Sequence, residues 1–202
     1  MELNYIHLSE LFGDPIKEER VNDLGERLLR LPAFCEEAER ALGKENKEKC
    51  AETLSWLWLL KSSGKLSDGA KIKREEGGKP FAQGGNDFEF SVAHSGGITV
   101  LATSKGHVGV DAERIRCVER RERLAERFFS ENERKQLCAA ADADTEFLRI
   151  WTKKEAYMKM KGTGLGEGIL ATDTSVLDTA FFEQTAELCG ERYIITVCTD
   201  TK

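Results

Sequence analysis

Hydrophobic positions in the first third of the chain recur with the period of an α-helix. Between residues 16 and 62, leucines three or four positions apart form two apolar stripes, which is typical of helices packed on a core. The stripes consist of Leu24, Leu28 and Leu31, and then of Leu54, Leu57, Trp58 and Leu60. Ser62-Ser63-Gly64 follows and predicts a helix end. We therefore expect a helical first segment.

The pattern changes to short apolar runs after residue 88. Phe88–Ala93 alternates as a strand does, and Ile98–Thr103 and Val108–Asp111 are further runs separated by glycine-containing turns. These runs predict a three-stranded antiparallel meander that carries Asp111 and Glu113 to a sheet end. Near the end of the chain, Thr174–Leu177 and Tyr193–Cys198 read as strands.

Helical spacing returns between the two groups of predicted strands. Ser130 and Glu133 form a capping box before a helix that runs toward Ala141. A second helix follows Asp142-Ala143-Asp144 and stops at Gly162. Its face contains Phe147, Trp151, Lys154 and Met158. The chain therefore reads as α+β with antiparallel sheets.

The composition of the chain argues against several classes of protein. The 202 residues suffice for one large domain or two small ones, and the net charge of −6 argues against a general nucleic-acid binder. The first residues lack the features of a signal peptide, and the longest apolar run, Leu54–Leu60, is too short for a bilayer. The six cysteines stand singly, away from the three histidines, which argues against zinc and favours a reducing cytoplasm.

Three acidic residues are candidates for a metal site. Asp111 and Glu113 at i and i+2 would lie on one face of a strand, roughly 6.5 Å apart along it. Carboxylate oxygens at such spacing suit a hard divalent cation. Glu155 is a third carboxylate, with Lys159 one helical turn later, and a cation beside lysines suits phosphate chemistry. Taken singly, each motif also fits solvated acids or an ordinary i,i+4 surface pair.

In combination, the motifs resemble one family. Gly109–Glu113, Trp151–Lys159 and Gly162–Leu165 occur in the order found in 4'-phosphopantetheinyl transferases of the larger, Sfp-like type. Two weaker signatures precede them, Gly78-Lys79-Pro80 and Ser91–Ser95. The resemblance is specific from about residue 78 to residue 165 and thin before that.

The resemblance implies an architecture of two similar halves related by a pseudo-two-fold, with the active site between them. Residues 1–105 would form the half that holds the nucleotide end of coenzyme A. Residues 106–202 would carry the metal site and the transferase motifs. Because one chain would supply both sides of the site, we expect an active monomer.

The resemblance also implies roles for individual residues. Mg²⁺, with Mn²⁺ as an alternative, would bind Asp111, Glu113 and Glu155. Coenzyme A would contact Lys79, His94, Ser95, Lys154 and Lys159. Glu155 and Lys159 are the expected catalytic residues, and either Glu155 or a water held by the metal would take the substrate's proton. Gly162 and the glycines after it would form a helix stop and a tight loop beside the pyrophosphate.

One position departs from the family's pattern. A basic residue usually precedes a Thr/Ser-Leu pair in the first half and helps to hold the 3'-phosphate of coenzyme A. The nearest match here is Glu52-Thr53-Leu54, with an acid in that place. Lys44, Lys47 and Lys49 are the candidate replacements.

The implied reaction moves 4'-phosphopantetheine from coenzyme A to a serine of an apo acyl or peptidyl carrier protein, and releases adenosine 3',5'-bisphosphate. Carrier proteins are acidic helical domains. The stretch Arg114–Arg127 has six arginines against three glutamates, so it reads either as a carrier-docking surface or as a solvated helix. No nucleic-acid or membrane partner is expected.

Two rival functions share some of these features. A carboxylate-metal phosphodiesterase or nuclease also clusters acids with a lysine, although the negative net charge and the His94-Ser95 pair weigh against it. A carrier-protein binder without catalysis would keep the fold, but the presence of all three carboxylates argues for chemistry.

Overall fold

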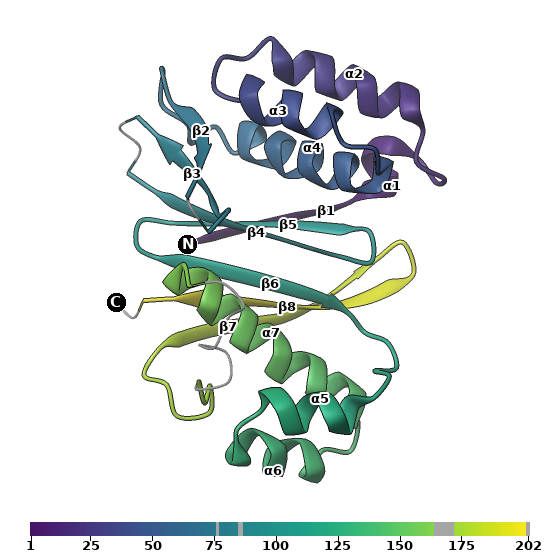
Figure 1. Cartoon of the computed structure of the whole chain (residues 1–202), viewed down its shortest axis with the longest axis vertical. Helices are drawn as coiled ribbons and strands as arrows, with labels where there is room; N and C mark the ends of the chain where they lie inside the picture. The colour runs from purple at the N-terminus through teal and green to yellow at the C-terminus, as the bar shows by residue number, and fades with distance from the viewer. Residues whose placement is uncertain (76, 85–86, 164–171, 201–202) are drawn as a thin grey trace. The chain divides into compact units, whose positions relative to one another are not determined.

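A computed structural model describes every residue of the chain except 76, 85–86, 164–171 and 201–202. The chain divides into two compact units, Met1–Lys105 and Gly106–Lys202, each with helices and an antiparallel sheet (Figure 1). The predicted α+β class is therefore confirmed. The pseudo-two-fold and a site between the halves stay predictions. Within the described ranges, no helix is both long and apolar enough to cross a membrane.

In its described residues, the first unit has four helices and a three-stranded sheet. The helices are α1 (Leu8–Phe12), α2 (Glu18–Leu29), α3 (Cys35–Leu42) and α4 (Lys47–Ser62). The sheet has the order β1-β5-β4, built from β1 (Glu2–His7), β4 (Glu89–Ser95) and β5 (Ile98–Ser104). A separate hairpin joins β2 (Lys71–Arg74) to β3 (Pro80–Gln83). Helix α4 packs on β1 and β5.

The predicted helical segment is confirmed by this first unit. Leu24 and Leu28 are buried on α2, and Leu54, Leu57 and Leu60 are buried on α4. Helix α4 ends at Ser62, where the serine-glycine stop predicts it. The leucine stripes thus form the core that fixes the helices against the sheet.

The second unit places one long helix along a three-stranded sheet. Its strands are β6 (Val108–Arg114), β7 (Ala180–Leu188) and β8 (Glu191–Thr199), in the order β6-β8-β7. Helix α7 (Ala143–Lys161) contacts β6 and β8, while α5 (Arg121–Phe128) and α6 (Glu131–Ala139) precede it (Figure 1). The capping box at Ser130 and Glu133 is present, as predicted.

Two strand predictions are wrong. The expected meander fails at its third strand, because β6 pairs with β8 and not with the β4–β5 hairpin. Local alternation identifies a strand but carries no information on a partner that lies 79 to 91 positions away in the sequence. Residues 174–177 form a turn rather than a strand, and the strand begins only at Ala180.

The two units repeat one topology. In each, the first strand and the middle strand of the sheet pair antiparallel, and the last two strands form a hairpin after the helices. Buried hydroxyls tie the main helix to the middle strand at matching places. The Ser55 and Thr99 hydroxyls lie 2.7 Å apart and those of Thr152 and Thr196 lie 2.8 Å apart, and the partners are 44 positions apart in the sequence in both cases. The expected similarity of the halves is confirmed at the level of topology.

Candidate active site

A glycine brings helix α7 against strand β6. A Cβ atom at Gly109 would lie 1.9 Å from the Ala156 carbonyl oxygen and 2.4 Å from the Met160 nitrogen. Both atoms belong to the backbone of α7 and have no freedom to move aside. The strand therefore requires glycine at this position, and Gly109 sets the distance at which α7 crosses the acidic strand.

This close approach pairs two predicted site residues. The Lys159 ammonium lies 2.8 Å from Asp111 Oδ1 and donates to the Val110 carbonyl at 3.0 Å. Asp111 is only 8% exposed. Burial raises the pKa of Asp111, while the charge and hydrogen bond of Lys159 oppose the rise. The sequence-predicted carboxylate and lysine thus meet across strand and helix.

Glu155 lies one helical turn before Lys159 and is 7% exposed. Burial, followed by the negative charge of Asp111, raises the pKa of Glu155 to about 7, with a smaller rise from Glu113 and an opposing effect of Lys159. The carboxylates of Glu155, Asp111 and Glu113 therefore repel one another. A group with this pKa exchanges a proton near neutral pH, as a general base requires.

The donor set fits a hard divalent cation. Asp111, Glu113 and Glu155 offer only carboxylate oxygens, and their mutual repulsion is what a bound Mg²⁺ would relieve. Among the described residues, no three acidic, histidine or cysteine side chains already enclose a space for an ion. Glu113 is half-buried, with Arg116 Nη2 at 3.6 Å from its Oε2. Binding of one ion by all three carboxylates would therefore require their oxygens to come closer together.

Lys154 occupies a different environment. Its ammonium is fully buried, lies 2.8 Å from Glu133 Oε2 and also donates to the Thr172 carbonyl. The other oxygen of Glu133 accepts from the Thr174 amide at 2.9 Å and from its hydroxyl at 2.7 Å. These contacts connect α6, α7 and the chain at 172–174. They favour a structural role for Lys154, and its predicted contact with phosphate is not tested.

His94 and Ser95 end strand β4 at a two-residue turn. Gly96 and Gly97 both have positive φ, 53° and 90°, which matches the type I′ hairpin turn. A Cβ at Gly97 would meet His7 Nε2 at 2.6 Å, so the turn is packed against a second histidine. His94 is exposed at the end of the hairpin. The turn thus presents an imidazole and a hydroxyl at one edge of the first unit.

The remaining predicted contacts are divided between the described and undescribed parts of the chain. Lys79 lies in the turn of the β2–β3 hairpin and is half-buried, directly before Pro80, which begins β3. Gly162 ends α7 with a φ of 71°. Gly164 and Leu165 of the expected loop lie outside the described residues, so their predicted place beside a pyrophosphate is untested.

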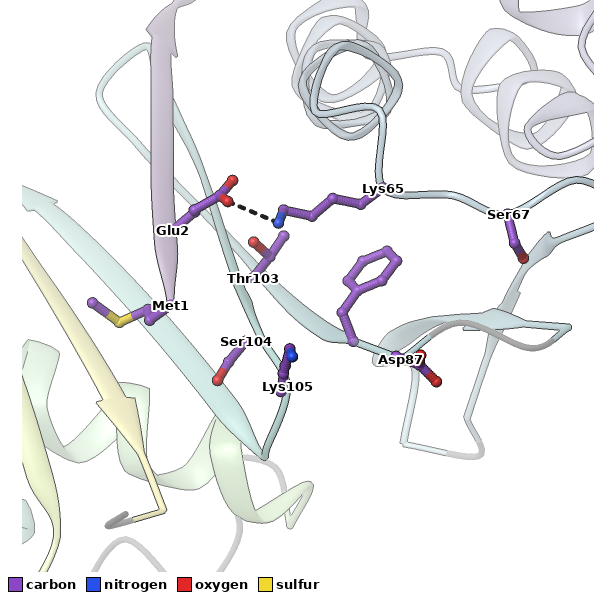
Figure 2. A pocket seen from close by; sticks show the side chains of 9 residues that line it. Met1, Glu2, Lys65, Ser67, Asp87, Thr103, Ser104 and Lys105 are labelled. Atoms are coloured by element: carbon purple, nitrogen blue, oxygen red, sulfur yellow. Dashed lines mark hydrogen bonds and ion pairs between the residues drawn. The ribbon is translucent and has the colours of Figure 1, made fainter.

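Two hollows of similar volume on the surface differ in whether predicted site residues line them. One of about 460 Å³ in the first unit holds the Lys65–Glu2 ion pair and contains none of the predicted site residues (Figure 2). Another, of about 470 Å³ in the second unit, adjoins Glu113. Its apolar lining consists of Val118, Leu124, Phe147, Leu148 and Trp151. Sequence reasoning missed this hollow, although apolar Val118 and Leu124 interrupt the basic stretch.

Comparison with known proteins identifies a family for the second unit. Residues 107–201 match the family described as the 4'-phosphopantetheinyl transferase superfamily. The second unit of this chain belongs to the 4'-phosphopantetheinyl transferase superfamily. This membership confirms the resemblance drawn from the motifs around Asp111 and Glu155.

Curated members of the superfamily match over part of their length. The transferase psf-1 of Bacillus pumilus is 35% identical over 100 residues, which cover 48% of this chain and 42% of that protein. Sfp of Bacillus subtilis is 32% identical over 97 residues, or 47% and 42%. AcpT of Salmonella typhi is 35% identical over 129 residues, or 62% and 65%. The matches thus span less than half of the first two transferases.

The structure also shows which lysine lies at the position where the family's pattern is broken. Lys44 Nζ donates to Thr53 Oγ1 at 2.7 Å and to the Lys49 carbonyl at 3.3 Å. Lys47 instead pairs with Glu18. Lys44 is therefore the candidate that places an ammonium beside the Glu52-Thr53-Leu54 segment.

Proposed function

We propose that this protein transfers 4'-phosphopantetheine from coenzyme A to a serine hydroxyl of an apo carrier protein, with Mg²⁺, and releases adenosine 3',5'-bisphosphate. The arrangement that carries the proposal is Lys159 paired with Asp111 beside Glu155, whose pKa is raised to about 7. Together with the superfamily membership of residues 107–201, it supports phosphate chemistry at the face between α7 and β6.

The reaction joins the serine oxygen to the phosphorus that carries pantetheine and breaks that phosphorus's bond to the bridging oxygen of the pyrophosphate. The bridging oxygen leaves with adenosine 3',5'-bisphosphate, and the serine proton moves to a base. Glu155 is a candidate for this base because it lies beside Asp111 and Lys159, and because burial and the charge of Asp111 raise its pKa to about 7 when no metal is bound. If Glu155 instead serves only as a metal ligand, water takes the proton.

The other site residues of the second unit would offset the negative charge of the pyrophosphate and of the leaving phosphate. Asp111, Glu113 and Glu155 would hold Mg²⁺, which would neutralise negative charge on the pyrophosphate. The Lys159 ammonium is already held by Asp111 and the Val110 carbonyl, so it is positioned before substrate binds. A preorganised cation of this kind stabilises charge that develops on the leaving phosphate.

The first unit supplies the contacts to the nucleotide end of coenzyme A in this proposal. His94 and Ser95 lie together at the β4–β5 turn, and Lys79 lies at the β2–β3 turn. Lys44 takes the part of the family's missing basic residue, because its ammonium lies against Thr53. Lys154, which is buried against Glu133, contributes to this site only through the fold.

The carrier protein docks at the apolar hollow beside Glu113 in this proposal. Arg116 lies at the edge of the hollow, and Arg120 and Arg123 are exposed on the same basic stretch. An apolar centre with a charged rim is the usual anatomy of a protein interface. Arg121 is unsuitable for docking because it is held by Asp144 at 2.6 Å.

The direct test is incubation with coenzyme A, Mg²⁺ and a panel of apo carrier proteins, followed by intact mass spectrometry. The proposal predicts that at least one carrier gains a phosphopantetheine group, and that EDTA prevents the gain. Hydrolysis of a phosphodiester or of DNA without carrier modification would favour the phosphodiesterase alternative. Carrier retained on the protein without a gain in mass would favour the binding protein without catalysis.

A further inference from the structure

The Gly78-Lys79-Pro80 turn lies at the tip of a two-stranded hairpin. The hairpin pairs β2 with β3 only, outside the three-stranded sheet of its unit. Inside the turn, the Gly78 amide donates to the Glu75 carbonyl at 2.8 Å, and the Glu75 amide donates to the Lys79 carbonyl at 2.9 Å. A short hairpin is marginally stable by itself, so further contacts must fix the direction of Lys79.

One guanidinium connects this turn to the helical core. Arg74 Nε and Nη2 donate to the Glu37 carboxylate at 3.0 Å and 2.8 Å, and Arg74 Nη1 donates to the Gly78 carbonyl at 2.8 Å. The Glu37 side chain on α3 is 2% exposed and also accepts Arg40 Nη1 at 2.6 Å. Arginine alone among side chains presents a planar fork that serves a carboxylate and a carbonyl together.

The position of the carbonyl matters for Lys79. Gly78 has a φ of 83°, and its carbonyl belongs to the peptide that joins Gly78 to Lys79. Fixing that carbonyl therefore fixes the orientation of the peptide from which Lys79 projects. Across the described part of the chain, no residue forms a hydrogen bond or an ion pair with the Lys79 ammonium. Its direction thus depends on the backbone of the turn.

A neighbouring ion pair connects the same strand and helix without a described hydrogen bond to the turn. Lys73 Nζ lies 2.6 Å from Glu36 Oε2 and 2.7 Å from its Oε1, and this pair also joins β2 to α3. Both side chains are substantially exposed, at 35% and 50%, and no hydrogen bond is described from the Lys73 ammonium to the turn. Lys73 is therefore a matched control for Arg74.

We propose that Arg74 is a positioning residue, which uses the buried carboxylate of Glu37 as its anchor and holds the turn so that Lys79 faces a phosphate of coenzyme A. This inference rests on the proposed function for the identity of the ligand. Arg74 touches neither the reacting atoms nor the pyrophosphate in this assignment. Its effect reaches the substrate through the Gly78–Lys79 peptide.

The test compares Arg74→Lys with Lys73→Met. Lysine keeps the positive charge beside Glu37 but cannot bond the carboxylate and the Gly78 carbonyl through one planar group. We expect Arg74→Lys to weaken coenzyme A binding about tenfold by calorimetry and to raise KM for coenzyme A similarly, with kcat within about twofold of wild type. Lys73→Met should change neither quantity by more than about twofold.

A double-mutant cycle separates positioning from general stability. In a Lys79→Met background, Arg74→Lys should no longer weaken coenzyme A binding, because the residue through which it acts is gone. Exchange of the Gly78 amide, followed by NMR, should become faster in Arg74→Lys and stay unchanged in Lys73→Met. Additive losses in the cycle, or unchanged exchange at Gly78, would overturn the inference.

The outcome also distinguishes this inference from the proposed function. If wild-type protein binds no coenzyme A but the Gly78 amide responds to Arg74→Lys, the turn is positioned and the ligand assignment is wrong. If wild-type protein binds coenzyme A and Arg74→Lys binds it equally well, the proposed function stands and the positioning role is wrong.

Discussion

Glu155→Gln should make the metal-free protein more stable at pH 8 while it removes transferase activity. Glu155 is 7% exposed, and burial together with the charge of Asp111 raises its pKa from 4.5 to about 7. An ionised carboxylate at this position therefore opposes folding. Glutamine has nearly the same size and carries no charge. It therefore removes the destabilising buried charge without leaving a cavity.

The direction in which stability changes with pH follows from the pKa of Glu155 in the folded and in the unfolded protein. An unfolded chain releases the Glu155 proton near pH 4.5, whereas the folded protein keeps it until about pH 7. The stability of wild type therefore falls as pH rises from 4.5 through 7. A shift of this size corresponds to about 3 kcal/mol at most, since one pKa unit is about 1.4 kcal/mol. Below pH 4.5 the variant and wild type should be equally stable.

Urea unfolding in EDTA at pH 4.5, 6 and 8 measures this difference. We expect the free energy of unfolding of Glu155→Gln to exceed that of wild type by about 2–3 kcal/mol at pH 8 and by almost nothing at pH 4.5. Exposed Glu126→Gln serves as the control and should show no such trend. A Glu155→Gln variant that is less stable than wild type at pH 8 would refute the reasoning.

Three further predictions concern the same unit. Asp111→Ala should abolish transfer, with unchanged circular dichroism, because it removes a metal ligand and the partner of Lys159; activity near wild type at low Mg²⁺ would contradict the site. Gly109→Ala should lower the free energy of unfolding by at least about 2 kcal/mol, since its Cβ would meet the α7 backbone at 1.9 Å; denaturant titration measures the loss. Arg123→Glu should raise KM for the carrier protein, and more so at low salt, whereas Lys135→Glu on α6 should leave it unchanged. If steady-state kinetics give the same KM for both variants, docking at the basic stretch is excluded.

The elements that the sequence predicts well are those whose signals are local. Helix α7 runs from Ala143 to Lys161 because Asp142 caps its start and Gly162 adopts the left-handed conformation at its end. Both signals are contained within a few residues. The motif residues Asp111 and Lys159 could also be chosen from the sequence, but only because their motifs occur together in the order of the transferase family; each motif alone also fits ordinary surface charges.

The elements that the sequence does not predict depend on distant partners. Strand β1, Glu2–His7, is mostly polar or half exposed, and it becomes a strand through its pairing with β5. Strand β2 has only Ile72 fully buried and reads as a loop until β3 pairs with it. Single-strand patterns cannot reveal such pairing.

Lys154 illustrates the same limit within the candidate site. In the sequence it stands beside Glu155 on a lysine-rich helix and is indistinguishable from a phosphate-binding residue. The structure pairs it with Glu133, which the sequence assigns only to a capping box. The capping glutamate uses one oxygen for the Ser130 amide and Lys154, and the other for Thr174. Such a contact between helices becomes visible only after the chain has folded.

The most direct test of the central claim is the stoichiometry of a single reaction. Wild-type protein is mixed with coenzyme A, Mg²⁺ and the carrier that responds in the panel, and both products are quantified by mass spectrometry and chromatography. We expect one adenosine 3',5'-bisphosphate to be released for each phosphopantetheine gained by the carrier serine, and neither product to form with Glu155→Gln. Release of adenosine 3',5'-bisphosphate without carrier modification, or full transfer by Glu155→Gln, would contradict this claim.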